Sequence, residues 1–218
     1  MDGVLFDSMP NHAISWHKVM QAHGLELTYE EAYKHEGRKG ADTIQIVCER
    51  QGVKLSDEEI KAIYQEKTEI FKTLPEPEPM PGSHAILQQV INDGLIPMIV
   101  TGSGQKSLLD SLNDFFPGVF CKERMVTSFD VSQGKPNPEP YLKALEKGKL
   151  NPWEAIVIEN APLGTIAANQ AGLFVIVVNT GPLPDNCLWE AGANLLYPSI
   201  QALINEWERI VGELGIRY

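Results

Sequence analysis

Four polar clusters lie at the ends of short apolar runs, and together they hold the residue types that phosphoryl transfer needs. In chain order they are Asp2 in MDGVLFDS, Thr101 in IVTGSG, Lys135 in QGKPNPEP, and Glu159 with Asn160 in VIENAPLG. The set offers a carboxylate, a hydroxyl beside backbone N–H donors, a cation and oxygen ligands for Mg²⁺. Each cluster alone is also compatible with a helix cap or a solvated loop, so the prediction depends on their combination.

The elements between these clusters predict a parallel sheet. Short apolar runs at 95–100, 125–128, 156–159 and 174–178 alternate with helical patterns. Strands that alternate with helices form βαβ units, whose parallel sheet is covered on both faces. Ligands of such sheets bind beyond the C-terminal ends of the strands, which is where the polar clusters fall.

Residues 12–74 differ from the rest, because they contain helix signals and no convincing strand. Thr28 with Glu31, and Ser56 with Glu59, each fit a capping box that begins a helix. The prolines of PEPEPMPG at 75–82 can neither continue a helix nor enter a central strand. We therefore expect an α/β fold, with a Rossmann-like core at 1–10 and 79–218 and an inserted all-helical cap at 11–78.

The composition is that of an ordinary globular protein and limits the partners. With 29 acidic and 18 basic residues the net charge is -11, which argues against a nucleic-acid partner. No apolar run approaches the roughly 18 residues of a membrane span, and no signal peptide is evident. The three cysteines, Cys48, Cys121 and Cys187, show no metal-binding spacing. We expect a cytoplasmic protein with no membrane partner, and a monomer because a cap must open and close.

The order D-G-V-x-x-D-S, T-G-S, G-K-P-x-P and E-N-A-x-x-G resembles the four motifs of the haloacid dehalogenase superfamily of phosphotransferases. The helical insert after the first motif resembles the cap of its β-phosphoglucomutase-like branch. This resemblance covers essentially the whole chain. It implies Mg²⁺ as cofactor, and an aspartyl-phosphate formed on the first Asp of a D-x-D motif.

The resemblance also implies roles for individual core residues. Asp2 matches the second Asp of D-x-D, which protonates the leaving group, activates water and turns its backbone carbonyl towards the metal. Thr101, with the backbone N–H groups of Gly102 and Ser103, would hold the transferring phosphoryl oxygens. Lys135 would neutralise the charge shared by nucleophile and phosphate.

The metal-binding pair and the nucleophile depart from the family pattern. Glu159 and Asn160 would complete the Mg²⁺ shell, but the branch usually has Glu-Asp there. We therefore expect weaker metal affinity without loss of the site. The nucleophile would lie two positions before Asp2, outside the 218 residues, as would the apolar strand leading into it. We expect these residues alone to be inactive and their natural parent to be an enzyme.

Two cap residues have both an ordinary and a functional interpretation. Lys67 lies in the apolar stripe of the helix after Ser56. It could extend to solvent, or it could point into the cleft to meet substrate charge, where the mutase branch has a phosphate-binding Lys. His12 could cap the first cap helix, and the family role would be a hydrogen bond to Asp2 when the cap shuts.

The stretch HEGRKG at 35–40 is either a surface turn or a substrate-specificity loop. In the second interpretation Glu36, Arg38 and Lys39 contact substrate, and the glycines allow close approach of the backbone. The mutase has an Arg where Gly40 stands here, which weakens the mutase alternative. The acid Glu36 would repel a phosphorylated sugar but could act on pyrophosphate through a metal or by orienting water.

The leading hypothesis is therefore a Mg²⁺-dependent phosphohydrolase, a phosphatase or pyrophosphatase, acting on a small phosphorylated metabolite or inorganic pyrophosphate. Two alternatives stay open. One is β-phosphoglucomutase, an isomerase with the same core. The other is a phosphate-binding regulatory protein without turnover.

Overall fold

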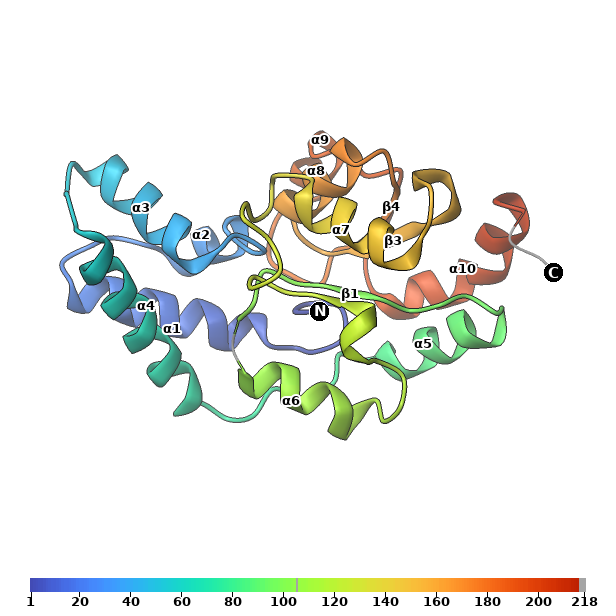
Figure 1. Ribbon diagram of the computed structural model, residues 1–218, viewed down its shortest axis with the longest axis horizontal. Coiled ribbons are helices and arrows are strands. Elements are labelled where there is room, and N and C mark those ends of the chain that lie inside the picture. Colours follow the sequence, from blue (N-terminus) through green and yellow to red (C-terminus); the bar gives the residue numbers. More distant parts are fainter. Residues whose placement is uncertain (105, 216–218) are drawn as a thin grey trace.

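The computed structural model describes residues 1–104 and 106–215, in a helical part and an α/β part (Figure 1). The helical part holds α1 (Met9–Ala22), α2 (Tyr29–Lys34), α3 (Gly40–Gln51) and α4 (Asp57–Lys72). The α/β part holds helices α5 (Ser83–Asn92), α6 (Lys106–Phe115), α7 (Glu139–Gly148), α8 (Pro162–Gln170), α9 (Asp185–Glu190) and α10 (Ile200–Glu213). Its strands are β1 (Ile99–Val100), β2 (Met125–Val126), β3 (Ile156–Glu159), β4 (Phe174–Val178) and β5 (Leu195–Tyr197). The predicted fold class is confirmed.

The helical part, called the cap below, is built from local signals and has a hydrophobic core of its own. Both predicted capping boxes are present: Thr28 and Glu31 begin α2, and Ser56 and Glu59 begin α4. In each box the hydroxyl accepts from the third helical N–H, while the Glu carboxylate accepts from the capping N–H. The buried cluster includes Val19, Met20, Ile44, Val47 and Ile63. The boundaries at 11 and 78 stay a prediction.

Two neighbouring segments connect the cap to the α/β part. Phe6 pairs with Pro79 in an antiparallel bridge. The N–H of Asp7 donates to the carbonyl of Glu78 at 2.9 Å, and the N–H of Met80 donates to the carbonyl of Leu5 at 2.8 Å. The proline-rich segment therefore runs beside the first turn of the chain, so the two chain connections to the cap lie side by side.

The strands pair in parallel and form two sheets among the described residues: β1 with β2, and β3 with β4 and β5. The predicted runs at 156–159 and 174–178 are strands over their full length, whereas those at 95–100 and 125–128 contribute only two residues each. Strand β5 was not predicted, because three residues show no decisive period.

Helices cover both faces of the longer sheet. On one face Ile176 and Val178 pack in a cluster with residues of α5 and α10, among them Ile86, Leu203 and Trp207. On the other face Val175 and Val177 pack with residues of α7 and α8. Strand β4 is thus buried on both sides, as expected in an α/β sandwich. No helix among residues 1–104 and 106–215 is both long enough and apolar enough to cross a membrane.

Candidate active site

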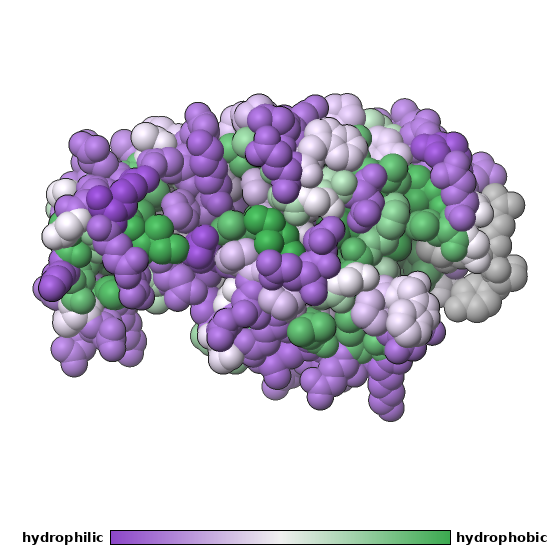
Figure 2. Space-filling model, turned by 90° about the horizontal axis from the view of Figure 1, so that it is seen from above, coloured by the Kyte–Doolittle hydropathy of each residue, from purple (hydrophilic) through white to green (hydrophobic). Residues whose placement is uncertain are grey.

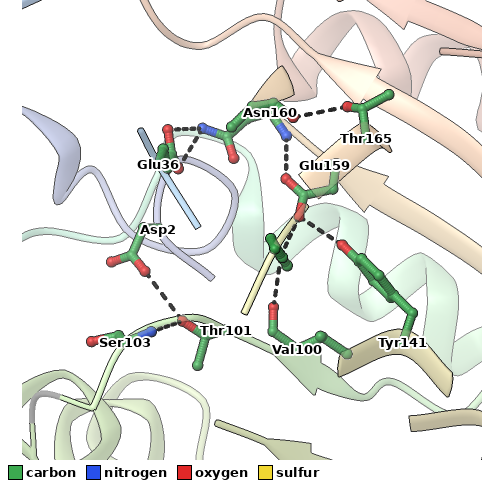
Figure 3. Close-up of polar contacts among 11 residues, drawn as sticks. Asp2, Glu36, Val100, Thr101, Ser103, Tyr141, Glu159, Asn160 and Thr165 are labelled. Atoms are coloured by element: carbon green, nitrogen blue, oxygen red, sulfur yellow. Dashed lines mark hydrogen bonds and ion pairs between the residues drawn. The ribbon is translucent and has the colours of Figure 1, made fainter. Parts of the chain in front are cut away.

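The turn after Met1 brings Asp2 into a ring of polar partners. Gly3 has φ of 63° and lies so close to Asn160 that a Cβ would stand 1.9 Å from its Nδ2, so only glycine fits. Ser8 Oγ donates to Asp2 Oδ1 at 2.7 Å, and Thr101 Oγ1 lies 3.4 Å from Oδ2 (Figure 3). Burial would raise the pKa of Asp2, but hydrogen bonds and charge from its neighbours, His12 first among them, lower it well below its usual range.

The cap delivers His12 and Lys67 to this carboxylate as a chain of contacts. His12 Nε2 lies 3.4 Å from Asp2 Oδ1, and Lys67 Nζ lies 2.7 Å from His12 Nδ1. Burial and then the Lys67 charge lower the pKa of His12, which favours a neutral ring with its proton on Nε2, facing Asp2. Lys67 is 1% exposed and does not extend to solvent; its ammonium lies about 5 Å above the rings of Trp16 and Phe71.

The TGSG turn follows β1 and folds back on itself. Thr101 N–H donates to the Val126 carbonyl at 2.9 Å, which fixes the turn to β2. Thr101 Oγ1 accepts from the N–H of Ser103 at 3.0 Å. Gly102 lies against the cap, where a Cβ would stand 2.3 Å from the Gly37 carbonyl oxygen. The hydroxyl of Thr101 thus stands between Asp2 and the Ser103 backbone (Figure 3).

Lys135 and Glu159 form a buried ion pair. Lys135 Nζ donates to Glu159 Oε1 at 2.5 Å and to the Val100 carbonyl at 3.3 Å. Tyr141 Oη donates to the same Oε1 at 2.6 Å (Figure 3). Burial would raise the pKa of Glu159, but Lys135 and the hydrogen bonds lower it. Nothing in the sequence marks Tyr141 as part of the site, since an aromatic residue at helical spacing usually indicates core.

Glu36 enters the core from the cap and meets Asn160. Asn160 Nδ2 lies 2.9 and 3.1 Å from the two carboxylate oxygens of Glu36 (Figure 3). Burial raises the pKa of Glu36 to about 8, and the charges of Asp2 and Glu159 add to the shift. The residue predicted to face substrate therefore lies against a predicted metal ligand, 124 positions away in sequence.

The other residues of the 35–40 loop divide between pocket and core. Lys39 Nζ donates to the carbonyls of Val131 and Ser132 at 2.6 and 2.8 Å, so it fastens the cap to the core and does not line the pocket. Arg38 lines the pocket, and its Nε is buried with no hydrogen-bond partner among the described residues. His35 also lines the pocket. Sequence reasoning missed it, because a lone His carries no spacing signal.

Cap and core enclose one polar pocket of about 70 Å³. Its lining includes Asp2, His12, Glu36, Arg38, Lys67, Thr101, Gly102, Ser103, Lys135, Glu159 and Asn160, so the structure brings together every predicted site residue except Lys39. Ligand pockets for larger molecules span roughly 300–1,000 Å³, so this closed form fits a compact ligand.

The donors of the pocket suit a hard divalent cation. Three carboxylates and an amide, from Asp2, Glu36, Glu159 and Asn160, converge there, and only Glu159 is paired with a Lys. The raised pKa of Glu36, caused by burial and then by its acidic neighbours, indicates negative charge that a cation would offset. No group of three or more His, Cys, Asp or Glu in metal-binding geometry occurs in the described part of the chain, so an amide or backbone oxygen would have to contribute.

Known proteins place the chain in a family. Residues 1–178 match the family model described as haloacid dehalogenase-like hydrolase. Hexitol phosphatase A of Escherichia coli (strain K12) is 29% identical over 179 residues, which is 82% of this chain and 80% of that protein. A phosphorylated carbohydrates phosphatase of Thermotoga maritima is 29% identical over 195 residues, which is 88% of this chain and 89% of that protein.

Among solved structures, a Bacteroides vulgatus protein described as a candidate beta-phosphoglucomutase is 58% identical. It superposes with a TM-score of 0.94, over 98% of this chain and 87% of that one. The resemblance seen in the motifs is therefore confirmed. The chain belongs to the haloacid dehalogenase-like hydrolases, in their β-phosphoglucomutase-like branch with a helical cap.

Proposed function

We propose that the chain forms the main part of a Mg²⁺-dependent phosphohydrolase whose preferred substrate is inorganic pyrophosphate or another compact phosphate compound. The observation that carries this proposal is the contact of Glu36 with Asn160 inside a pocket of about 70 Å³. An acid at this place leaves little room for a sugar bisphosphate. A small substrate that arrives with a cation tolerates it.

In the proposed reaction, a carboxylate two positions before Asp2 attacks phosphorus, and the bond from phosphorus to the leaving oxygen breaks. Thr101 and Lys135 would hold the transferring oxygens. Water then attacks the aspartyl-phosphate, gives a proton to Asp2, and releases phosphate. Mg²⁺, held by Asp2, Glu159 and Asn160, would supply charge neutralisation to the phosphoryl oxygens when bound.

The ionised state of Asp2 also favours a phosphate leaving group. Hydrogen bonds and charge from its neighbours, chiefly His12, outweigh burial and keep the pKa of Asp2 low, so the carboxylate is ionised at neutral pH. An ionised Asp2 cannot donate a proton to a sugar alkoxide. A phosphate ion leaves without such help, so pyrophosphate requires less from the acid.

β-Phosphoglucomutase stays the second candidate, because the Bacteroides vulgatus protein carries that description at 58% identity. The mutase must return the phosphoryl group to a sugar, which requires the cap to hold a bisphosphate. Arg38 would have to supply the distal contact. A phosphate-binding protein without turnover is the third candidate. For all three we propose a monomer that works in the cytoplasm without nucleic acid or membrane.

The test uses protein in which an Asp stands two positions before Asp2, with Mg²⁺ present. Phosphate release is measured with pyrophosphate, hexose phosphates and β-glucose 1-phosphate with its bisphosphate. We expect pyrophosphate to be the best substrate and Glu36→Ala to reduce its turnover far more than that of hexose phosphates. Isomerisation to glucose 6-phosphate that outruns phosphate release would refute the hydrolase. Phosphate binding without turnover of any substrate would favour the binding protein.

A further inference from the structure

Lys39 occupies a position that normally belongs to a helix-capping residue. It is the N-cap of α3, with an extended backbone and no side-chain hydrogen bond to the helix. The two other cap helices with an extended N-cap have Thr28 and Ser56 there. A Lys satisfies none of the first N–H groups and adds positive charge to the positive end of the helix. A residue that breaks a local rule in this way points to a role in the tertiary structure.

The ammonium of Lys39 bonds across the boundary between cap and core. Its Nζ donates to the carbonyls of Val131 and Ser132, and it is the only donor to either carbonyl among the described residues. Gly134 gives the Lys39 side chain room, because a Cβ there would stand 2.9 Å from Lys39 Cγ. In Figure 1 the yellow loop before α7 extends towards the cap, and Figure 2 shows the cap, on the left, in contact with the α/β part.

Glu139, the first residue of α7, holds the same stretch of backbone. Its carboxylate accepts from the N–H of Ser132 at 2.8 Å and from the N–H of Gln133 at 2.7 Å. It also accepts from the Ser132 hydroxyl at 2.6 Å. These hydrogen bonds, that of the Ser132 side chain first, lower the pKa of Glu139 to about 2. The carboxylate is therefore ionised at neutral pH.

Lys39 and Glu139 are linked through two peptide groups. The Val131 carbonyl and the Ser132 N–H belong to one peptide group, and the Ser132 carbonyl and the Gln133 N–H belong to the next. In a trans peptide the N–H and the C=O point in opposite directions, so each group stands between the carboxylate and the ammonium. Hydrogen bonds in such a series strengthen one another, and bonds to ions are the strongest. The two side chains therefore form an ion pair bridged by backbone.

The bridged pair fixes the cap loop that carries Glu36. Glu36 lies three residues before Lys39, within a turn that is closed where the N–H of Arg38 donates to the His35 carbonyl at 3.2 Å. After Lys39 the chain enters α3, where the N–H of Thr43 donates to the Lys39 carbonyl at 3.1 Å. Lys39 is thus bonded to the core through its ammonium and to the cap through its backbone. While both bonds hold, Glu36 keeps its place in the pocket.

We propose that Lys39 and Glu139 are positioning residues that hold the cap closed through the two peptide groups between Val131 and Gln133, together called the cap latch. Neither side chain lines the pocket. By fixing the loop that carries Glu36, the latch keeps the pocket near 70 Å³ and so selects compact substrates. The latch follows from the contacts alone, whereas its effect on substrate choice rests on the proposed function.

Hydrogen exchange tests the bridge itself. Lys39→Met should speed exchange of the Ser132 and Gln133 amides about 10-fold, although Lys39 touches neither N–H, because each peptide group loses its bond to the ammonium. Lys39→Arg keeps the charge and at least two donors, so it should restore most of the protection. Lys34→Met is the matched control, since that cap lysine is 51% exposed and paired with Glu30 at 2.8 Å. Unchanged exchange in Lys39→Met would overturn the latch.

Binding of inorganic phosphate, measured by calorimetry, tests whether the latch holds the cap closed. Lys39→Met and Glu139→Gln should each weaken binding about 10-fold, because the closed form is less populated. The double variant should lose little more than either single variant, since both changes remove the same latch. Losses that multiply in the double variant, or unchanged affinity in both single variants, would overturn it.

Kinetics of a catalytically active form with Mg²⁺ test the effect on substrate choice. Lys39→Met and Glu139→Gln should raise KM for pyrophosphate about 10-fold and leave kcat/KM for hexose phosphates unchanged, with Lys39→Arg close to wild type. Equal losses for both substrates would overturn the role of the latch in substrate choice. Faster exchange and weaker phosphate binding as expected, in a protein that hydrolyses no pyrophosphate, would support the latch and refute the proposed function.

Discussion

The core side and the cap side of the pocket hold their charges in opposite ways. On the core side Lys135 and Glu159 are paired with each other, and this pairing lowers the pKa of Glu159 against the effect of burial. On the cap side Glu36 accepts from a neutral amide and Lys67 contacts a neutral imidazole. Burial raises the pKa of Glu36 to about 8 and lowers that of Lys67 to about 7.

This difference shows on which side of the pocket the charges are fixed before a ligand binds. The Glu159 carboxylate stays charged near neutral pH because its counter-ion lies within the protein. Glu36 and Lys67 can lose or gain charge near neutral pH, because burial disfavours their charged forms and the groups they contact directly are neutral. A ligand and its cation can therefore change the charge of the cap side, whereas they meet a fixed arrangement on the core side.

The largest effect is expected where the core pair is broken. Lys135→Met leaves Glu159 as a buried carboxylate without its counter-ion, so the free energy of unfolding should fall by about 3–5 kcal/mol. Urea unfolding at pH 7 measures it. Lys147→Met is the control, since its pair with Asp130 at 3.1 Å is partly exposed, and should cost about 0–1 kcal/mol. Equal losses in the two variants would contradict the comparison.

On the cap side, Glu36→Gln should raise the free energy of unfolding, in contrast to the loss expected for Lys135→Met. With a folded pKa of about 8 against an ordinary 4.5, wild-type Glu36 costs nothing below pH 4.5 and progressively more as the pH rises to 8. The variant should therefore gain roughly 3 kcal/mol on wild type between pH 5 and pH 8, after allowance for partial exposure. Urea unfolding in metal-free buffer at both pH values checks this.

The exposed acid Glu69, whose side chain is 61% exposed, provides the control for Glu36. Glu69→Gln should leave the difference between pH 5 and pH 8 unchanged. A Glu36→Gln protein with the same pH dependence as wild type would show that Glu36 is ionised in the fold and that the cap side is as preset as the core.

Lys67→Met should change stability and catalysis in opposite directions, raising the free energy of unfolding and lowering turnover. Because the folded pKa of about 7 lies below the ordinary 10.5, the cost of the buried ammonium is full below pH 7 and disappears as the pH rises to 10.5. The free energy of unfolding should rise by roughly 1–2 kcal/mol at pH 6 and less at pH 9. In a catalytically active form, turnover should fall as His12 Nδ1 loses its donor.

Lys72→Met is the matched control for Lys67, because that side chain is 51% exposed and lies beside Glu69. It should change neither stability nor turnover by much. Destabilisation by Lys67→Met at pH 6 would indicate that the cap ammonium has an anionic partner, which would remove the contrast between the two sides.

The smallest effect on stability is expected for Gly102→Ala, at an uncharged contact between cap and core. In Gly102→Ala the new Cβ would stand 2.3 Å from the Gly37 carbonyl oxygen, so the cap loop must withdraw. Binding of inorganic phosphate, measured by calorimetry, should weaken about 10-fold, as overpacking of 1–3 kcal/mol implies. Gly24→Ala is the control for affinity alone: a Cβ there meets nothing within 4 Å and Gly24 does not line the pocket, while its φ of 69° makes the substitution destabilising. Unchanged affinity in Gly102→Ala would mean that phosphate binds with the cap open.

Much of the core side could be predicted because it depends on short-range patterns. The runs at 156–159 and 174–178 are strands because β-branched residues fill them, and Glu159 and Asn160 lie at the end of the first. The ends of β1 and β3 then meet at one pocket, which Thr101 and Glu159 both line, although the two strands belong to separate sheets. The helix starts at Thr28 and Ser56 were equally predictable, since each capping box closes within four residues.

The cap side could be predicted only as a list of residues. The positions of Glu36 and Lys67 in the sequence indicated contact with a ligand, but not the groups they meet. Glu36 contacts Asn160 across 124 positions, and Lys67 contacts His12 across 55. His35 and Tyr141 joined the site without any motif. Lys39 was predicted to contact substrate but lies outside the pocket, because its ammonium donates to two carbonyls of the core.

The sequence by itself determined the family, the α/β core with its helical insert, and the set of polar residues at the strand ends, because apolar period, caps and motifs act over a few residues. Only the tertiary structure decided which charges are paired and which are neutralised. Those outcomes depend on burial and on neighbours far apart in the chain, and both arise only when cap, helices and sheet have packed together.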